Sequence, residues 1–148
     1  MRSLTNVSIP LLVVFTLLSG MVTACSLSNS AAGPLAMAPL DQMPADVRSA
    51  PRTVQEAYRF NVANPEIMKH IPCYCGCDGI GHTSNYDCYV SSVDEDGVIT
   101  FDNHALGCSI CVDITLDVMR MLREGKSAQE ARTTIDAIYS RYGTSNIP

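Results

Sequence analysis

The sequence lacks the features that would place it in several common functional classes. It has no run of basic residues, and its 15 Asp and Glu outnumber its 10 Lys and Arg. Because nucleic-acid binding depends on neutralising phosphates, no nucleic-acid partner is expected. The chain also has no nucleophile–base pair at a recognisable spacing and no glycine loop that would cradle a phosphate. We therefore do not expect an enzyme, with thiol–disulfide redox chemistry as the only enzymatic alternative.

The N-terminal apolar run is too short to span a membrane. Arg2 is the only charge before IPLLVVFTLLSGM, whereas a span needs roughly 20 apolar residues. A basic start, a short apolar run and small residues before a cleavage point are typical of a secretory signal. Val22-Thr23-Ala24 precedes Cys25, which resembles the bacterial lipoprotein cleavage box. We predict a lipoprotein signal peptide over residues 1–24 and acylation, such as palmitate, on Cys25.

Acylation would tether the mature chain to a membrane outside the cytoplasm. Lipoproteins of this kind usually carry two or three acyl chains, and a second chain makes stable an anchor that is marginal with one. The expected location is the extracytoplasmic side of the cell membrane or outer membrane. Residues 25–50 are rich in Ala, Ser and Pro, which predicts a flexible linker. Residues 51–148 are expected to form one small cysteine-rich domain.

The domain is predicted to be mostly helical, a small α+β fold with a cysteine-rich loop and a short hairpin insertion. Thr53 and Glu56 have capping-box spacing at a first helix start. Asn64-Pro65 marks a second start, and that helix should stop before Pro72. Residues on either side of Asp96-Gly97 are β-branched or aromatic, which predicts the hairpin.

Two C-terminal segments carry the clearest helical periodicity. The first should end at Gly125, and the second should begin with a capping box of Ser127 and Glu130 and stop at Gly143. Their apolar stripes are expected to be core: Ile114, Val118, Met121 and Leu122 in the first, and Ala131, Ile135, Ile138, Tyr139 and Tyr142 in the second.

Six cysteines remain once Cys25 is set aside. An even number in a small secreted domain is the usual mark of disulfides, so a disulfide-stapled interaction module is one alternative. Residues two apart in a strand lie about 6.5–7 Å apart at Cα, near the limit of a disulfide. Bridges within Cys73–Cys77 are therefore disfavoured.

A metal site uses the same spacing better. Thiolates on one tetrahedral ion lie about 2.3 Å from it, and a bend at Gly76 would bring Cys75 and Cys77 onto one ion. Soft thiolates favour Cu(I), Zn or an iron–sulfur cluster. Outside the cytoplasm we favour Cu(I) over Zn, with no metal expected if the cysteines are disulfide-bonded.

The second half of the site is expected from HALGCSIC. If a helix begins near Asn103, then His104, Cys108 and Cys111 stand at i, i+4 and i+7 and share one face. His70 lies at a helix end, where a dipole interaction is the simpler interpretation. The predicted ligands are the clustered thiols and the two other histidines: Cys73, Cys75, Cys77, Cys88, Cys108, Cys111, His82 and His104.

A redox pair is a further alternative. Cys108 and Cys111 have CxxC spacing at a helix start, where the dipole would lower the pKa of the first thiol. No strand–helix–strand pattern precedes them, however, and no cis-proline candidate follows.

Three motifs together resemble the bacterial PCYCGC-motif lipoprotein family. They are PCYCGC at Pro72–Cys77, GHTSNYDC at Gly81–Cys88 and HALGCSIC at His104–Cys111. The resemblance covers most of residues 51–148 and the lipoprotein box. It implies the architecture and the importance of the cysteines, without a biochemical activity to transfer.

The leading hypothesis is a membrane-tethered extracytoplasmic binding protein for a soft metal ion. Its partners would be the membrane, through the lipid anchor, and a protein that donates or accepts the metal.

Overall fold

The computed structural model describes residues 33–147. The predicted signal peptide (1–24) and the predicted acylation site Cys25 lie outside the described residues. Within residues 33–147, no helix is long and apolar enough to cross a bilayer.

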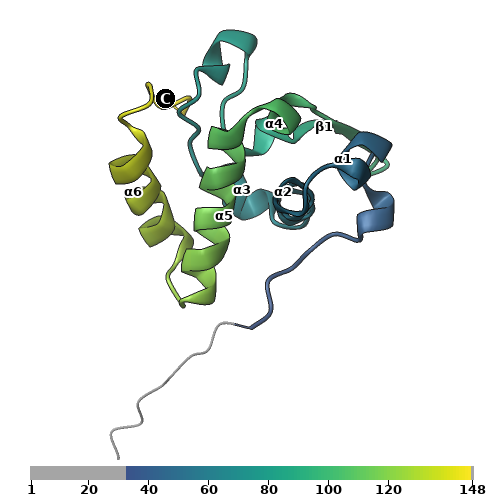
Figure 1. The fold of residues 1–148 in the computed structure, drawn as a ribbon, viewed down its shortest axis with the longest axis horizontal. Coiled ribbons are helices and arrows are strands. Elements are labelled where there is room, and N and C mark those ends of the chain that lie inside the picture. Colours follow the sequence, from purple (N-terminus) through teal and green to yellow (C-terminus); the bar gives the residue numbers. More distant parts are fainter. Residues whose placement is uncertain (1–32, 148) are drawn as a thin grey trace, which may run out of the picture.

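A central helix, α5 (Ser109–Arg123), packs between α2 (Arg52–Ala63) and α6 (Ala128–Tyr139) (Figure 1). With two neighbours, α5 buries more than one face. Three of the four predicted stripe positions, Ile114, Val118 and Met121, are buried. The other buried residues of the helix are Cys111, Val112, Thr115 and Met119. The predicted mostly helical fold class is confirmed.

The boundary between α5 and α6 follows the predicted signals. Gly125 adopts a left-handed φ of 83°, and the next amide, of Lys126, donates to the Met121 carbonyl at 3.0 Å. This is the bonding of a glycine-terminated helix. The Ser127 hydroxyl then accepts from the Glu130 amide at 3.2 Å, while the Glu130 carboxylate accepts from the Ser127 amide at 2.8 Å. The predicted capping box is confirmed.

The end of α6 differs from expectation. The helix ends at Tyr139, and Tyr142, predicted to be core, is 56% exposed. Gly143 is not the helix stop. It lies instead where the chain passes close to Tyr74, because a Cβ added there would stand 2.8 Å from the Tyr74 carbonyl oxygen.

The start of α2 also differs from expectation. Pro51 is the N-cap residue and no side chain caps the helix. Because the helix begins at Arg52, Thr53 lies inside its first turn and cannot act as the cap. Glu56 pairs with Arg52 at 2.8 Å instead, so the predicted Thr53–Glu56 capping box is wrong.

A short helix, α3 (Pro65–Met68), follows with Pro at its first position, as predicted. The cysteine-rich segment after it is loop with two short 3-10 turns, η2 (Cys77–Ile80) and η3 (Tyr86–Cys88). The hairpin of β1 (Val90–Val93) and β2 (Ile99–Phe101) is antiparallel, as predicted.

The expected continuous helix from Asn103 is interrupted. A short helix, α4 (His104–Gly107), ends before Cys108, which has φ −120° and ψ 101° and then serves as the N-cap of α5. Glycine has the weakest helix propensity of any residue except proline, and the break follows directly after Gly107. The prediction that His104, Cys108 and Cys111 share one helix face is therefore wrong.

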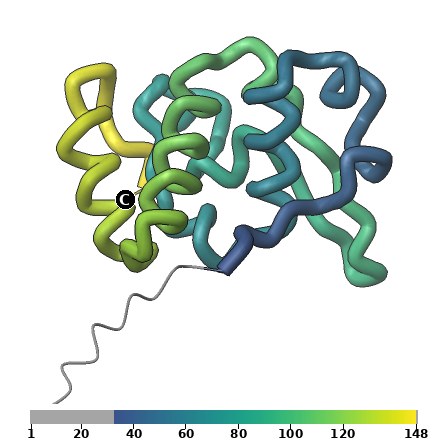
Figure 2. Tube along the Cα trace, turned by 60° about the horizontal axis from the view of Figure 1, so that its bottom comes forward, coloured from purple at the N-terminus to yellow at the C-terminus, as the bar shows by residue number. Residues whose placement is uncertain are grey.

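Part of the expected linker belongs to the packed domain. Residues 33–50 follow the side of the molecule away from α6 (Figure 2), and they include η1 (Leu40–Gln42) and α1 (Ala45–Ser49). Met43 and Val47 are 2% and 1% exposed. The packed domain thus starts before residue 51, because these apolar side chains bury against it.

A fragment of residues 51–148 should be less stable than a fragment of residues 33–148. Burying a side chain such as Met43 or Val47 contributes about 1.5–3 kcal/mol, so losing both should lower the free energy of unfolding by about 3–6 kcal/mol. Urea denaturation of both fragments measures the difference. Met43→Ala in the longer fragment should reproduce part of the loss. Equal stabilities of the two fragments would contradict the placement of residues 33–50.

Candidate metal centre

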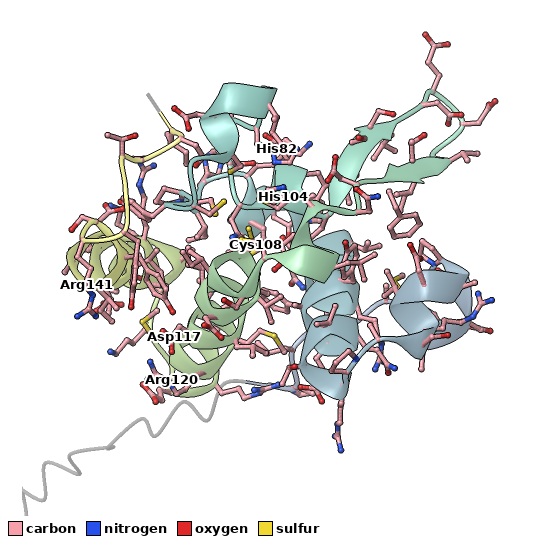
Figure 3. All side chains as sticks on the ribbon, turned by 45° about the horizontal axis from the view of Figure 1, so that its top comes forward. His82, His104, Cys108, Asp117, Arg120 and Arg141 are labelled. Atoms are coloured by element: carbon pink, nitrogen blue, oxygen red, sulfur yellow. The ribbon has the colours of Figure 1, made fainter. Side chains whose placement is uncertain are left out.

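Six thiols gather at the N-terminal end of α5. Figure 3 shows His82, His104 and Cys108 together at that end, with Asp117 and Arg120 further along the helix. The cysteines come from the loop after α3, from η2 and η3, and from the start of α5. None of the six forms a disulfide within residues 33–147.

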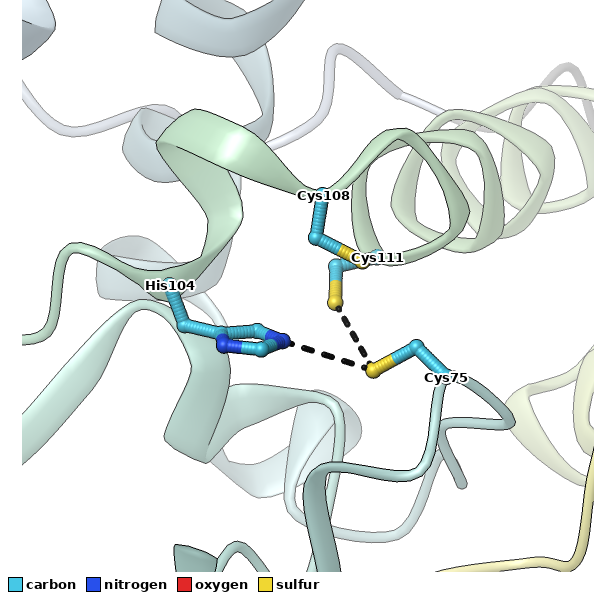
Figure 4. A group of neighbouring side chains, drawn as sticks. All are labelled: Cys75, His104, Cys108 and Cys111. Atoms are coloured by element: carbon cyan, nitrogen blue, oxygen red, sulfur yellow. Dashed lines mark hydrogen bonds between the residues drawn. The ribbon is translucent and has the colours of Figure 1, made fainter.

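Four potential ligands form what we call the outer group: Cys75, His104, Cys108 and Cys111. Their ligand atoms all lie within 4.8 Å of one another. The Cys75 sulfur is 3.4 Å from Nε2 of His104 and 3.6 Å from the Cys111 sulfur (Figure 4). Three of the four are half-buried and Cys111 is fully buried, so the outer group has one side near solvent.

The remaining three cysteines form what we call the inner group: Cys73, Cys77 and Cys88. Their sulfurs also lie within 4.8 Å of one another, with Cys77 and Cys88 separated by 3.7 Å. All three are at most 2% exposed. The inner group is therefore enclosed.

The sulfur–sulfur contacts have the spacing of ligands on an ion. Four of the sulfur pairs are separated by 3.4–3.7 Å. Two thiolates at about 2.3 Å from a tetrahedral ion lie about 3.8 Å apart, whereas a disulfide joins sulfurs at about 2.05 Å. The six predicted cysteines thus form a cluster with possible metal-binding geometry.

The loop and the helix break decide how the ligands divide. Gly76 adopts a left-handed φ of 80°, and the thiols on either side of it enter different groups, Cys75 the outer and Cys77 the inner. The prediction that Cys75 and Cys77 bind the same ion therefore does not match this arrangement, because the two thiols belong to different groups. The break at Cys108 still leaves the ligand atoms of His104, Cys108 and Cys111 close to the Cys75 sulfur.

A residue near the C-terminus holds the loop in place. The Cys73 amide donates to Oδ1 of Asn146 at 2.7 Å, and the Asn146 amide donates to the Cys73 carbonyl at 3.1 Å. The Asn146 side-chain amide also donates to the Cys77 sulfur at 3.5 Å. Sequence reasoning missed Asn146, because nothing in TSNIP indicates a contact with a loop some seventy residues earlier.

A buried polar network holds the first turn of α5. The carbonyl oxygen of Cys111 accepts hydrogen bonds from the Tyr89 hydroxyl at 2.8 Å and from the Asn85 side-chain amide at 3.3 Å. The Thr115 hydroxyl donates to Oδ1 of Asn85 at 2.8 Å. This network fixes the backbone from which the Cys111 thiol projects. Tyr89 and Thr115 were not among the residues predicted from the sequence.

The two predicted histidine ligands are placed differently. His104 belongs to the outer group, but His82 belongs to neither group. The His82 ring packs edge-on against His104 with centroids 5.3 Å apart, and its Nε2 lies 3.4 Å from a carboxylate oxygen of Asp102. The other oxygen of Asp102 accepts from the His104 amide at 2.7 Å. Asp102 therefore positions both histidines, and His70 is exposed at the end of α3.

Close contact between the thiols lowers the pKa of some of them and raises the pKa of others. A hydrogen bond from Cys111 lowers the pKa of Cys73 well below its usual range, and the same bond raises the pKa of Cys111. Hydrogen bonding by Cys88 and then by His104 lowers the pKa of Cys75 to about 5, against the opposing effect of burial. Burial raises the pKa of Cys108, opposite to the lowering that a redox pair at a helix start would use.

Comparison with known proteins places the chain in a family. A family model described as "Protein of unknown function with PCYCGC motif" matches residues 18–146. Because the match covers most of the chain, the protein belongs to this family, and the resemblance noted from the three motifs is confirmed. No curated protein and no solved structure matches the chain.

Cys75 should react with alkylating agents at a pH where ordinary thiols do not. With its pKa lowered to about 5, Cys75 is mostly thiolate at pH 6, and the reaction should be lost as pH falls through that value. Cys108 is the matched control, because it is equally half-buried but its pKa is raised by burial. Allowing for the weaker nucleophilicity of a low-pKa thiolate, iodoacetamide at pH 6 should label Cys75 roughly tenfold faster.

Peptide mass spectrometry of the metal-stripped chain measures both labelling rates. Equal labelling of Cys75 and Cys108 at pH 6 would contradict the acidity assigned to Cys75.

Proposed function

We propose that this PCYCGC-family protein is a membrane-tethered extracytoplasmic binding protein for a soft metal ion, Cu(I) or Zn. One observation carries the proposal. The outer group brings three sulfurs and one imidazole nitrogen, from a loop, a short helix and the start of α5, to within 4.8 Å of one another.

The donor set supports a soft ion. Three thiolates and one imidazole form a set typical of tetrahedral zinc sites, and thiolates also select Cu(I) over harder ions. Four protein ligands fill a tetrahedral shell, whereas catalytic zinc sites keep one position open for water or substrate. Binding is therefore better supported than metal-assisted catalysis.

The half-exposed side of the outer group suits exchange of the ion. Cys75, His104 and Cys108 are half-buried, so a partner's ligand would reach the ion without unfolding the domain. A protein that donates or accepts the metal is the partner this arrangement fits. The helix α5 and the Cys111 carbonyl network keep the fourth ligand in place during such an exchange.

The proposed lipid anchor would keep the site close to the membrane. Leu35 already packs against the core, and it follows Cys25 by ten positions. Even fully extended, a segment of that length reaches at most about 35 Å. The proposed tether is thus shorter than residues 25–50 would have allowed, which favours a partner that is itself at the membrane.

Elemental analysis with thiol titration tests metal binding. The full chain, purified anaerobically in detergent, should carry a tightly bound soft metal and release free thiols when the metal is removed. His104→Ala and Cys108→Ser each remove a proposed ligand and should weaken metal binding by more than roughly 10–100-fold, which is the cost of losing a residue that only hydrogen-bonds to a ligand. His70→Ala is the matched control, because His70 is exposed and outside both groups.

Two outcomes would contradict this proposal. A chain with three complete disulfides and no metal would support the disulfide-stapled interaction module instead. Thiol-oxidation or insulin-reduction activity that disappears in Cys108→Ser, with the fold intact, would support the redox alternative.

The membrane tether has its own test. Cys25→Ser should release the protein from the membrane fraction and abolish the acylated N-terminal peptide detected by mass spectrometry. Cys108→Ser is the control, and it should stay in the membrane fraction because Cys108 belongs to the domain. If Cys25→Ser remains anchored to the same extent, the lipoprotein assignment is incorrect.

A further inference from the structure

The inner group is left over when the outer group alone holds an ion. Cys73, Cys77 and Cys88 are 0%, 2% and 0% exposed, and their sulfurs lie within 4.8 Å of one another. A buried cysteine is by itself only a small apolar side chain. Three of them in mutual contact, beside a possible metal site, form a donor set of their own.

One sulfur connects the two groups. Cys73 belongs to the inner group, yet its sulfur is 3.4 Å from Cys75 and 3.5 Å from Cys111, both of the outer group. These contacts are as short as those within each group. A thiolate sulfur has lone pairs for two ions, so Cys73 is placed to be a ligand on both sides.

One further contact places a hydrogen-bond donor on a sulfur of the inner group. The Asn146 side-chain amide donates to the Cys77 sulfur at 3.5 Å, a bond that an ionised sulfur accepts more strongly than a neutral one. Asn146 is itself 7% exposed, and its Oδ1 accepts from the Cys73 amide at 2.7 Å. Asn146 therefore holds the backbone of Cys73 and the sulfur of Cys77 in fixed positions relative to each other.

We infer that the inner group is a second metal site, for Cu(I), joined to the outer site by the Cys73 thiolate as a bridging ligand. The inference rests on the proposed function and extends it from one ion to a pair of adjacent ions. The protein would then hold one ion near the surface and one in the interior.

The inner group selects Cu(I) by its number of ligands and its burial. Structural zinc is almost always four-coordinate, and the inner group offers three sulfurs in an enclosed position. Cu(I) is a soft ion that three thiolates satisfy. Each thiol that becomes a ligand releases one proton and the copper stays Cu(I), so no oxidant or reductant is needed.

The two sites would fill in order. The outer group is half-exposed and the inner group is enclosed, so the first ion enters the outer group. That ion would fix Cys75 and Cys111, the outer-group thiols that contact Cys73. The bridging sulfur is then held in place for the second ion.

Anaerobic titration of the full chain with Cu(I), against a competing chelator, tests the inference. The wild-type chain should bind two Cu(I), with metal–metal scattering in X-ray absorption after the second equivalent. Cys88→Ser should bind one Cu(I) and show no such scattering, and Cys73→Ser should do the same. Ser84→Ala is the matched control, because Ser84 is buried in the same loop at 3% exposure; it should bind two.

The outcomes separate this inference from the proposed function. One Cu(I) in both the wild-type chain and Cys88→Ser overturns the inner site and leaves the outer site standing. Two Cu(I) retained by Cys88→Ser also overturns it. No Cu(I) or Zn bound by the wild-type chain overturns the proposed function itself. If Cys88→Ser loses its helical circular dichroism, the scattering signal of the wild-type chain decides the matter.

Discussion

The contact between Cys111 and the thiols of Cys73 and Cys75 is the interaction on which the rest of the structure depends. It joins the cysteine-rich loop to the first turn of the central helix. The carbonyl of Cys111 accepts hydrogen bonds from Tyr89 and Asn85. Cys111 is therefore part of both the sulfur cluster and the buried polar network, so a shift of its backbone would move its thiol relative to the other sulfurs.

Burying six thiols at one end of a helix creates an electrostatic constraint. A thiolate in this cluster raises the pKa of the thiols that donate to it, as Cys73 does for Cys111. More than a few thiolates would repel one another in a medium that screens poorly. A cation removes that repulsion, which couples binding of the proposed ion to the stability of a small domain.

Much of the fold was predictable from local patterns. The Ser127–Glu130 capping box, the left-handed Gly125 and the hairpin at Asp96-Gly97 each depend on a few adjacent residues. The misses have different causes, one local and one dependent on distant residues. Thr53 does not cap α2 because Pro51 starts the helix earlier, and residues 33–50 pack on the domain because Met43 and Val47 find apolar partners there.

The amino-acid sequence by itself indicated the soft donors, because clustered cysteines and a nearby histidine can be recognised as such without knowing the fold. It also led to the expectation that the cysteine-rich loop and the HALGCSIC segment meet. Only the tertiary structure decided how they meet. The left-handed Gly76 and the break at Cys108 divide the donors into an outer and an inner group, and Asn146 secures the loop. These are contacts between residues far apart in the chain, which no local spacing encodes.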